Sequence, residues 1–164
     1  MIDEYIRRHG RRLYGLCRSL CADHADADDL YQETWLRAIR HMDKYDPAYE
    51  FGPWLTKICV NAYRSRLRQL SRTPLLDFPT TEEKDRLLDS MPAPEQRDYA
   101  PLHEAVSRLP DKLRLAVVLF YFQGMDLSST AKLLKIPVGT VKSRMNKARK
   151  LLKEVLVDET DLRF

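Results

Sequence analysis

Small and polar residues recur on one face of the segment 136–153, close to the C-terminal end of the sequence. At helical spacing this face gathers Gly139, Thr140, Ser143, Asn146, Lys147 and Lys150. Apolar side chains fall on the opposite face and predict a buried stripe of Val141, Met145, Ala148 and Leu152. Short polar side chains at the start of a helix can reach base edges, and lysines further along can bind phosphates. The chemistry that this segment indicates is binding to DNA.

The residues just before this segment would position it for such a role. Residues 127–134 have the periodicity of a second, shorter helix, and residues 135–138 are too few for anything but a tight turn. Two short helices joined by a turn, the second one basic, predict a helix-turn-helix. The alternative is a basic helix that only keeps a small domain soluble. The turn spacing and the small residues at the helix start favour DNA binding.

A second group of residues is acidic and lies between Cys21 and Glu33, a stretch without Lys or Arg. Several of these acids would lie in the first turns of a helix, where the helix dipole favours negative charge, so capping explains part of the pattern. At about 100° per residue, the inward side of this helix would carry Ala27, Leu30, Thr34 and Ala38. The outward side would carry Asp28, Asp29, Gln32, Leu36 and Ile39. Exposed Leu and Ile beside acids indicate a surface that binds a basic partner.

A third group combines aromatic and basic residues. The connector 43–53 contains Pro, Gly and Pro as breakers and three aromatic side chains, Tyr45, Tyr49 and Phe51. The next helix is expected to begin at Pro53 or Trp54 and to bury Trp54, Ile58 and Ala62. Its opposite stripe is Lys57, Asn61, Arg64 and Arg68. Residues 57–72 include five bases and no acid, so this stripe is suited to phosphates.

The two kinds of side chain in this group suggest two roles on a single DNA strand, contact with bases and contact with phosphates. Aromatic rings can stack on unpaired bases. Phe51 is expected to pack inward on Trp54, which leaves Tyr45 and Tyr49 for base contact, together with Asn61. Lys57, Arg64 and Arg68 are then expected to hold the phosphates.

Length and composition limit the remaining possibilities. At 164 residues with 44% apolar content, the chain fits one ordinary domain or two small ones, and no run is long enough to span a membrane. The N-terminal residues lack the uninterrupted apolar core of a signal peptide, so we expect a cytoplasmic protein without membrane insertion. Cys17, Cys21 and His24 could be metal ligands, but the cysteines continue an apolar seam, so buried thiols are the better interpretation. The sequence contains no convergent carboxylates and no activated nucleophile that would indicate an enzyme, so we do not expect one.

Three stretches together resemble the extracytoplasmic-function (ECF) sigma factors: Asp26–Glu33, Trp54–Asn61 and Ile136–Arg144. The resemblance spans almost the whole chain and implies an all-α fold. We expect no cofactor and no metal, because the residues form no suitable cluster. It implies that core RNA polymerase binds Asp28, Asp29, Gln32, Glu33 and Leu36. It implies that the minus-ten promoter element binds Tyr45, Tyr49, Lys57, Asn61, Arg64 and Arg68. The minus-thirty-five element would bind Thr140, Lys142, Ser143, Arg144, Lys147 and Lys150.

The same resemblance predicts how the chain is divided and regulated. Two small helical domains, residues 1–70 and 102–164, would be joined by a flexible linker over 71–101, where several prolines and an excess of acids occur. That linker is either a solvated spacer or a segment that threads a polymerase channel. An anti-sigma factor is an expected partner. The competing function is a stand-alone helix-turn-helix regulator that binds operators.

Departures from the family pattern lie near the predicted turn. Lys135 stands where Gly is frequent, because a left-handed backbone suits that position. The turn is therefore expected to be strained or differently shaped. Ser129 and Thr130 stand where acids are common in the family, which leaves that helix less negative.

Overall fold

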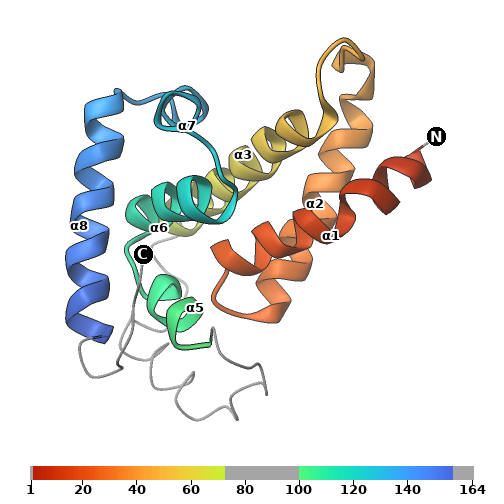
Figure 1. Ribbon diagram of the computed structural model, residues 1–164. Coiled ribbons are helices and arrows are strands. Elements are labelled where there is room, and N and C mark those ends of the chain that lie inside the picture. The colour runs from red at the N-terminus through yellow and green to blue at the C-terminus, as the bar shows by residue number, and fades with distance from the viewer. Residues whose placement is uncertain (1, 73–99, 157–164) are drawn as a thin grey trace.

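The computed structural model describes residues 2–72 and 100–156, and within these ranges the chain is helical with no strand (Figure 1). The N-terminal part contains α1 (Ile2–Leu20), α2 (His24–Arg40), the 3-10 turn η1 (Met42–Lys44) and α3 (Phe51–Arg72). The C-terminal part contains α5 (Ala100–Ser107), α6 (Asp111–Val117), the π-helical turn η2 (Val118–Phe122), α7 (Leu127–Leu134) and α8 (Val138–Leu156). The predicted all-α fold is confirmed, whereas most of the predicted linker lies outside the described residues. None of the described helices is long and apolar enough to cross a membrane.

Helix α2 forms where its acids and apolar residues predict it. The Asp23 side chain caps its N-terminus by accepting a hydrogen bond of 2.8 Å from the backbone N–H of Asp26, which satisfies a donor that the helix leaves unpaired. The inward set is buried as predicted, namely Ala27, Leu30, Thr34 and Ala38. Trp35 is buried beside them. One wall of the N-terminal core is therefore the face that the sequence periodicity indicated.

Helix α3 differs from its prediction at its start and in its buried face. It begins at Phe51, before Pro53, and its buried side chains include Leu55, Cys59, Val60, Ala62 and Tyr63. Trp54 and Ile58 are only partly buried, so their predicted core positions are wrong. The reason is that α3 packs against α1 and α2 and also against the C-terminal helices, so its buried face is wider than one stripe and turned from the expected one.

Phe51 is the centre of an aromatic cluster at the start of α3. Its side chain is 5% exposed, its ring stacks on Tyr5 at 4.2 Å between centroids, and it lies 5.3 Å from Trp54. Trp35 closes the cluster from α2 at 6.3 Å. The prediction that Phe51 packs inward on Trp54 is confirmed.

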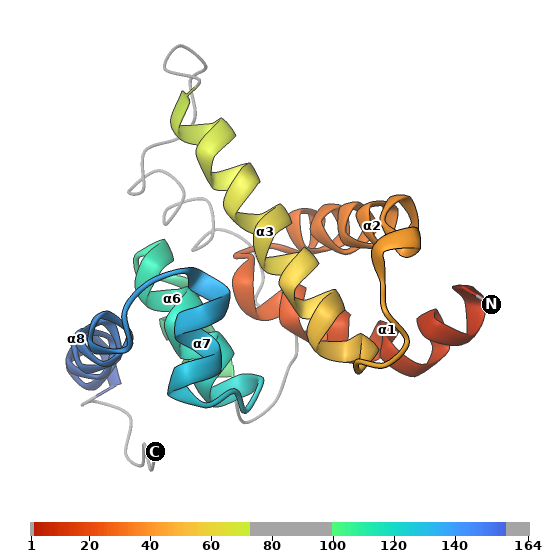
Figure 2. The same cartoon turned by 90° about the horizontal axis from the view of Figure 1, so that it is seen from above.

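The C-terminal helices form the predicted helix-turn-helix: α7 has the predicted bounds, and α8 begins at Val138 and ends at Leu156, beyond the predicted end at residue 153. Asp126 caps α7 by accepting a hydrogen bond of 2.6 Å from the backbone N–H of Ser129, and this bond holds the pKa of Asp126 below its usual value. The predicted stripe on α8 is buried, with Val141, Met145, Ala148 and Leu152 packed inward. Helices α6 and α7 lie between α8 and the N-terminal helices, so α8 forms the outer edge of the molecule (Figures 1 and 2).

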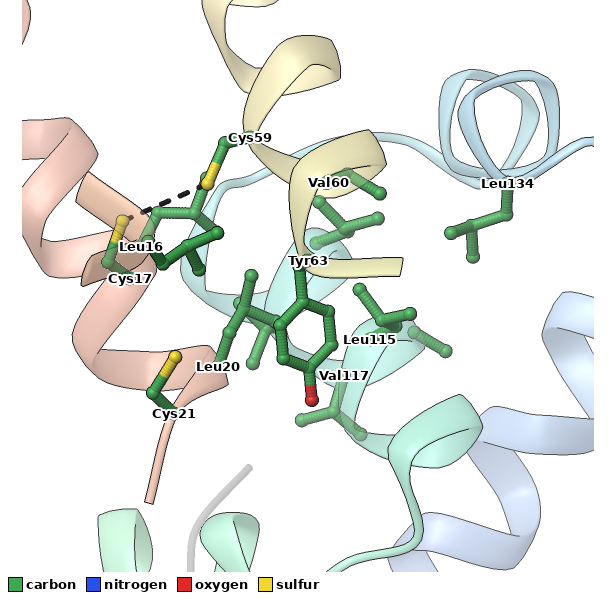
Figure 3. Close-up of a cluster of buried hydrophobic side chains, with 14 of the residues drawn as sticks. Leu16, Cys17, Leu20, Cys21, Cys59, Val60, Tyr63, Leu115, Val117 and Leu134 are labelled. Carbon is green, nitrogen blue, oxygen red and sulfur yellow. Dashed lines mark hydrogen bonds between the residues drawn. The ribbon is translucent and has the colours of Figure 1, made fainter. Parts of the chain in front are cut away.

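The two helical regions share one continuous core (Figure 3). Tyr63 and Val60 of α3 lie beside Leu115 and Val117 of α6, so side chains far apart in sequence meet at the junction. Apolar burial of this kind stabilises the contact by about 25 cal/mol for each Å² removed from water. The two regions therefore lie against each other through buried apolar side chains.

The three cysteines are buried and free. The Sγ atoms of Cys17 and Cys59 are 3.8 Å apart, and burial raises the pKa of Cys21 to about 12, which keeps its thiol protonated. In the part of the chain that the structure describes, no group of His, Cys, Asp and Glu is arranged to hold a metal ion. The interpretation of these cysteines as core thiols is confirmed.

Candidate docking and nucleic-acid surfaces

The outward face of α2 combines apolar and acidic side chains. Leu36 and Ile39 are each 50% exposed, and the three polar members of the predicted docking set are exposed beside them: Asp28, Asp29 and Gln32. Glu33 is half-buried and accepts a hydrogen bond of 2.8 Å from Nε of Arg37, one turn further along. The face therefore presents an apolar pair with exposed carboxylates next to it.

Several of these acids already have partners within the chain. The hydroxyl of Tyr14 donates to Asp28 at 2.8 Å. Arg66 of α3 lies 3.3 Å from the carboxylate of Asp26 and 3.9 Å from that of Asp29. Exposed ion pairs of this kind add about 0–1 kcal/mol to stability, so their main effect is to neutralise charge. No local sequence pattern indicates this role of Arg66, because its partners lie on another helix.

A shallow groove of about 410 Å³ runs beside this face, between α1 and α2. Its lining combines aromatic, charged and amide side chains: Gly10, Arg11, Tyr14, Asp28, Tyr31 and Gln32. A Cβ at Gly10 would lie 3.0 Å from the hydroxyl of Tyr31, so a side chain there would require the Tyr31 ring to shift by a few tenths of an ångström. Two residues of the predicted docking set, Asp28 and Gln32, therefore border a groove that the sequence did not reveal.

The aromatic residues of the connector have separate places in the structure. The side chain of Tyr49 is 73% exposed. Tyr45 is half-buried, with its ring 5.0 Å from Trp54 and 5.3 Å from Phe51, and its hydroxyl donates to the backbone carbonyl of Tyr49 at 2.6 Å. Tyr45 thus packs in the cluster and supports the connector, while Tyr49 is the one of the three that presents its ring to solvent.

The basic stripe of α3 is partly used by the chain itself. Lys57, Asn61 and Arg68 are exposed. Arg64 is half-buried, and its Nη1 donates to the backbone carbonyl of Leu134 at the end of α7, at 3.2 Å. A residue that the sequence assigned to phosphate binding is therefore joined to the helix-turn-helix in this arrangement.

Most of the polar side chains predicted to bind DNA on α8 are open to solvent. Lys142, Ser143, Lys147 and Lys150 are exposed, and Thr140 and Arg144 are half-buried. Arg149, on the same helix, donates to the Tyr121 hydroxyl at 2.8 Å and lies over its ring at 5.7 Å. Arg149 thus anchors α8 to η2, and the predicted set remains on the outer surface.

The turn between α7 and α8 has the left-handed conformation that a glycine would adopt. Lys135 has φ 57° and ψ 45°, and the N–H of Ile136 donates to the carbonyl of Ala131 at 3.1 Å, which closes the end of α7. A side chain with a Cβ in this region costs about 1–2 kcal/mol. Of the two predicted alternatives, the structure favours a strained turn, because Lys135 itself takes the left-handed conformation.

Two family descriptions match the chain, one for each helical region. The sigma-70 region 2 family matches residues 5–73, and the sigma-70 region 4 family matches residues 99–152. The first contains the acidic face of α2 and the basic stripe of α3. The second contains the helix-turn-helix.

Individual relatives give the same result over nearly the full chain. It is 35% identical over 159 residues to the ECF RNA polymerase sigma factor SigE of Mycolicibacterium smegmatis, with 94% of this chain and 61% of the relative covered. It is 33% identical to the ECF RNA polymerase sigma factor SigM of Mycobacterium tuberculosis, with 94% and 76% covered. The chain thus spans less than two thirds of the length of SigE.

Solved structures with the same arrangement of helices include two proteins that were solved in complex with a partner. RpoE of Bartonella quintana, in complex with the anti-sigma factor NepR, matches with a TM-score of 0.72 and 24% identity, covering 96% of this chain and 98% of that one. CnrH, in complex with the cytosolic domain of CnrY, matches with a TM-score of 0.65 and 26% identity, covering 96% and 88%. At 24% identity, the similarity to RpoE of Bartonella quintana concerns the fold alone.

Proposed function

This chain belongs to the extracytoplasmic-function sigma factors of the sigma-70 family, and on that premise we propose that it binds core RNA polymerase, recognises promoter DNA and starts transcription of a stress- or signal-dependent set of genes. The observation that carries the proposal is the order of three surfaces on one chain. An acidic and apolar face on α2 is followed by a basic stripe on α3 and then by an exposed polar face on α8. Its place of action would be the cytoplasm, where the polymerase works.

The N-terminal region decides against a stand-alone operator-binding regulator. Such a protein would need a module for dimerisation or ligand sensing in that half of the chain. The region 2 match occupies this half instead, over residues 5–73. The exposed Leu36 and Ile39 supply an apolar anchor for a protein partner, and Asp29 and Gln32 supply polar contacts around it.

The docking proposal predicts that Asp29→Ala combined with Gln32→Ala weakens binding to core polymerase by about thirtyfold, since two lost contacts of roughly 1 kcal/mol each sum to about 2 kcal/mol. Both side chains are exposed on α2, so the helix content should stay the same. Titration of a fluorescent variant with purified core enzyme measures the affinity, and circular dichroism measures the helix content.

The matched control is Asp43→Ala, which removes an exposed acid from η1 that is not a member of the predicted docking set. It should bind core polymerase like the wild type. Undiminished affinity of the double variant would mean that these residues serve only the helix, and the docking proposal would fail.

We assign the minus-ten element to Tyr49, Asn61 and the basic residues of α3, and the minus-thirty-five element to α8. On α8, Lys147 and Lys150 would hold phosphates. Lys147→Ala should therefore weaken binding to every duplex sequence alike and lower the slope of log affinity against log salt by about 1. Ser143→Ala, nearer the helix start, should change which sequences bind. Equal salt slopes for Lys147→Ala and wild type would remove that residue from the interface.

An anti-sigma factor is the regulator that we propose for this chain. The support is that CnrH, which is similar in fold and 26% identical, was solved in complex with another protein, the cytosolic domain of CnrY. Coexpression with the products of neighbouring genes should reduce transcription from a target promoter. Unchanged transcription with every one of those products would exclude them as inhibitors.

A further inference from the structure

An apolar side chain is exposed at the first residue of α8. Val138 is 39% exposed, whereas the exposed side chains of Lys135 and Lys142 near it in the sequence are charged. The apolar stripe that holds α8 against the other helices begins three residues later, at Val141, which is fully buried. Val138 is therefore not part of that stripe, and packing within the chain does not account for a valine at this position.

The next residue, Gly139, has open space where a side chain would be. A Cβ built there would meet no side chain and no distant backbone within 4 Å in the part of the chain that the structure describes. Its φ is not positive, because Gly124 is the glycine with that conformation among the described residues. Glycine also destabilises a helix relative to alanine. The missing side chain therefore leaves room on the outer surface of α8 and serves no contact inside the protein.

The first turn of α8 holds these two residues in fixed positions. The carbonyl of Pro137 accepts hydrogen bonds from the backbone N–H groups of Thr140 at 3.0 Å and of Val141 at 3.2 Å. A β-branched side chain in a helix has essentially one preferred rotamer, so Val138 would lose little conformational freedom when another surface covers it. Valine is also a weaker helix former than alanine. The stability of α8 thus explains neither Val138 nor Gly139.

The major groove of DNA offers one apolar group that such a side chain can recognise. Each base pair presents its own pattern of hydrogen-bond donors and acceptors there, and thymine adds a C5-methyl group. The first residues of the second helix in a helix-turn-helix lie against the base edges. The side chain of Val138 has no donor and no acceptor, so the methyl group is the feature that it can read. A bare backbone at Gly139 would let the helix come close enough for that contact.

We propose that Val138 contacts the C5-methyl group of a thymine in the minus-thirty-five element, and that Gly139 provides the room for this contact. The inference rests on the proposed function, and it adds one base and the residue that reads that base. The contact is favourable because it removes apolar surface of both partners from water. The neighbouring side chains of Lys142 and Ser143 can donate hydrogen bonds to adjacent base pairs, which Val138 cannot do.

Replacement of thymine by uracil tests the contact, because it keeps base pairing and removes only the C5-methyl group. Core polymerase loaded with this chain first selects duplexes from a random library. Each thymine of the selected minus-thirty-five element is then replaced in turn by deoxyuridine, and fluorescence anisotropy measures binding. At one position the replacement should weaken binding of the wild type by about three- to fivefold, as expected for one buried methyl group. Val138→Ala should bind the thymine duplex more weakly by a similar factor and should not distinguish thymine from uracil there.

Leu151→Ala is the matched control for Val138→Ala. Leu151 is 38% exposed on the same helix, toward its other end. This variant should keep the wild-type preference for thymine over uracil, and circular dichroism should show both variants folded. The same ratio of thymine to uracil affinity for Val138→Ala and wild type at every position would overturn the contact.

The room at Gly139 is tested with Gly139→Ala. The added methyl group should weaken binding to the selected duplexes by about tenfold, because it occupies space that the base edges need. The temperature of thermal unfolding should stay at or above that of the wild type, since alanine is the better helix former. Gly15→Ala is the matched control, because Gly15 of α1 is also exposed and helical with nothing within 4 Å of its Cβ position, and it should leave DNA binding unchanged. Wild-type affinity of Gly139→Ala would overturn this part of the proposal.

The selection step separates failure of this inference from failure of the proposed function. Selected duplexes that share a sequence, with no thymine read through Val138, would leave the proposed function standing and remove the inference. If the loaded polymerase selected no common sequence, the proposed function would be wrong, and the inference would fall with it.

Discussion

Tyr49→Ala should slow promoter opening by about tenfold or more while closed-complex formation stays nearly intact. Stacking of a base on an aromatic ring is worth about 1–3 kcal/mol, and about 1.4 kcal/mol corresponds to a factor of ten in rate. The ring of Tyr49 is 73% exposed, so its removal leaves no cavity in the protein. Stopped-flow fluorescence with a base analogue in the minus-ten element measures the opening rate.

On the proposed function, a large effect is expected because a protein that starts transcription without an energy source must offset the cost of unpairing DNA. Extrusion of a base costs a few kcal/mol, and contacts that only the open strand can make must offset this cost. Tyr49 lies in the connector directly before the basic stripe of α3, so one strand could meet the ring and then Lys57 and Arg68. Loss of the ring should therefore affect opening more than initial binding.

Two comparisons decide whether stacking is the cause. Tyr49→Phe keeps the ring and should open promoters at close to the wild-type rate, and a promoter with a pre-melted bubble should rescue Tyr49→Ala. Wild-type opening of duplex promoters by Tyr49→Ala would make the connector a passive link. Tyr45 was predicted to share this role, but it packs on Trp54 and Phe51, so Tyr45→Ala would mix any effect on opening with a loss of stability.

Phe51→Ala should lower the free energy of unfolding by about 3–5 kcal/mol, the usual cost of deleting a buried aromatic side chain. Its ring contacts rings from three other parts of the N-terminal region: Tyr5 and His9 of α1, Trp35 of α2 and Tyr45 of the connector. The loss would leave a cavity that these large rings cannot readily fill. Urea denaturation followed by circular dichroism measures the change.

Phe51→Leu is the matched control, because it keeps most of the apolar volume and loses only ring contacts. It should cost clearly less than Phe51→Ala. Tyr49→Ala, two residues away and exposed, should leave the free energy of unfolding within about 0.5 kcal/mol of the wild type. A loss below about 1 kcal/mol for Phe51→Ala would show that the cluster does not hold α3 against α1 and α2.

Periodicity of the apolar residues correctly predicted the helices that bury only one face. Helix α7 has the expected bounds of 127–134, and the stripe of α8 that includes Val141 and Met145 is buried as expected. The same logic was wrong for Trp54 and Ile58, because α3 is covered from two sides. A wheel diagram assumes one buried face, and a helix at the junction of two regions does not meet that assumption.

Charge patterns located candidate surfaces but not the partners that the chain supplies itself. The exposed Leu36 and Ile39 were expected, and so was the basic stripe. The bonds of Arg64 to Leu134 and of Arg114 to Tyr63 join residues that are 70 and 51 positions apart. Such pairs depend on how two regions lie together, and neither spacing nor composition within one region contains that information.

The position of Arg66 changes what the acidic face of α2 can offer a partner. Because this arginine lies beside Asp26 and Asp29, the face carries less uncompensated negative charge than its sequence implies. Added salt would screen the internal pairs as well as those made with a partner, so the two effects offset each other in part. Apolar contacts of Leu36 and Ile39 with a partner are insensitive to such screening. Docking on this face should therefore persist at ionic strengths that release purely ionic complexes.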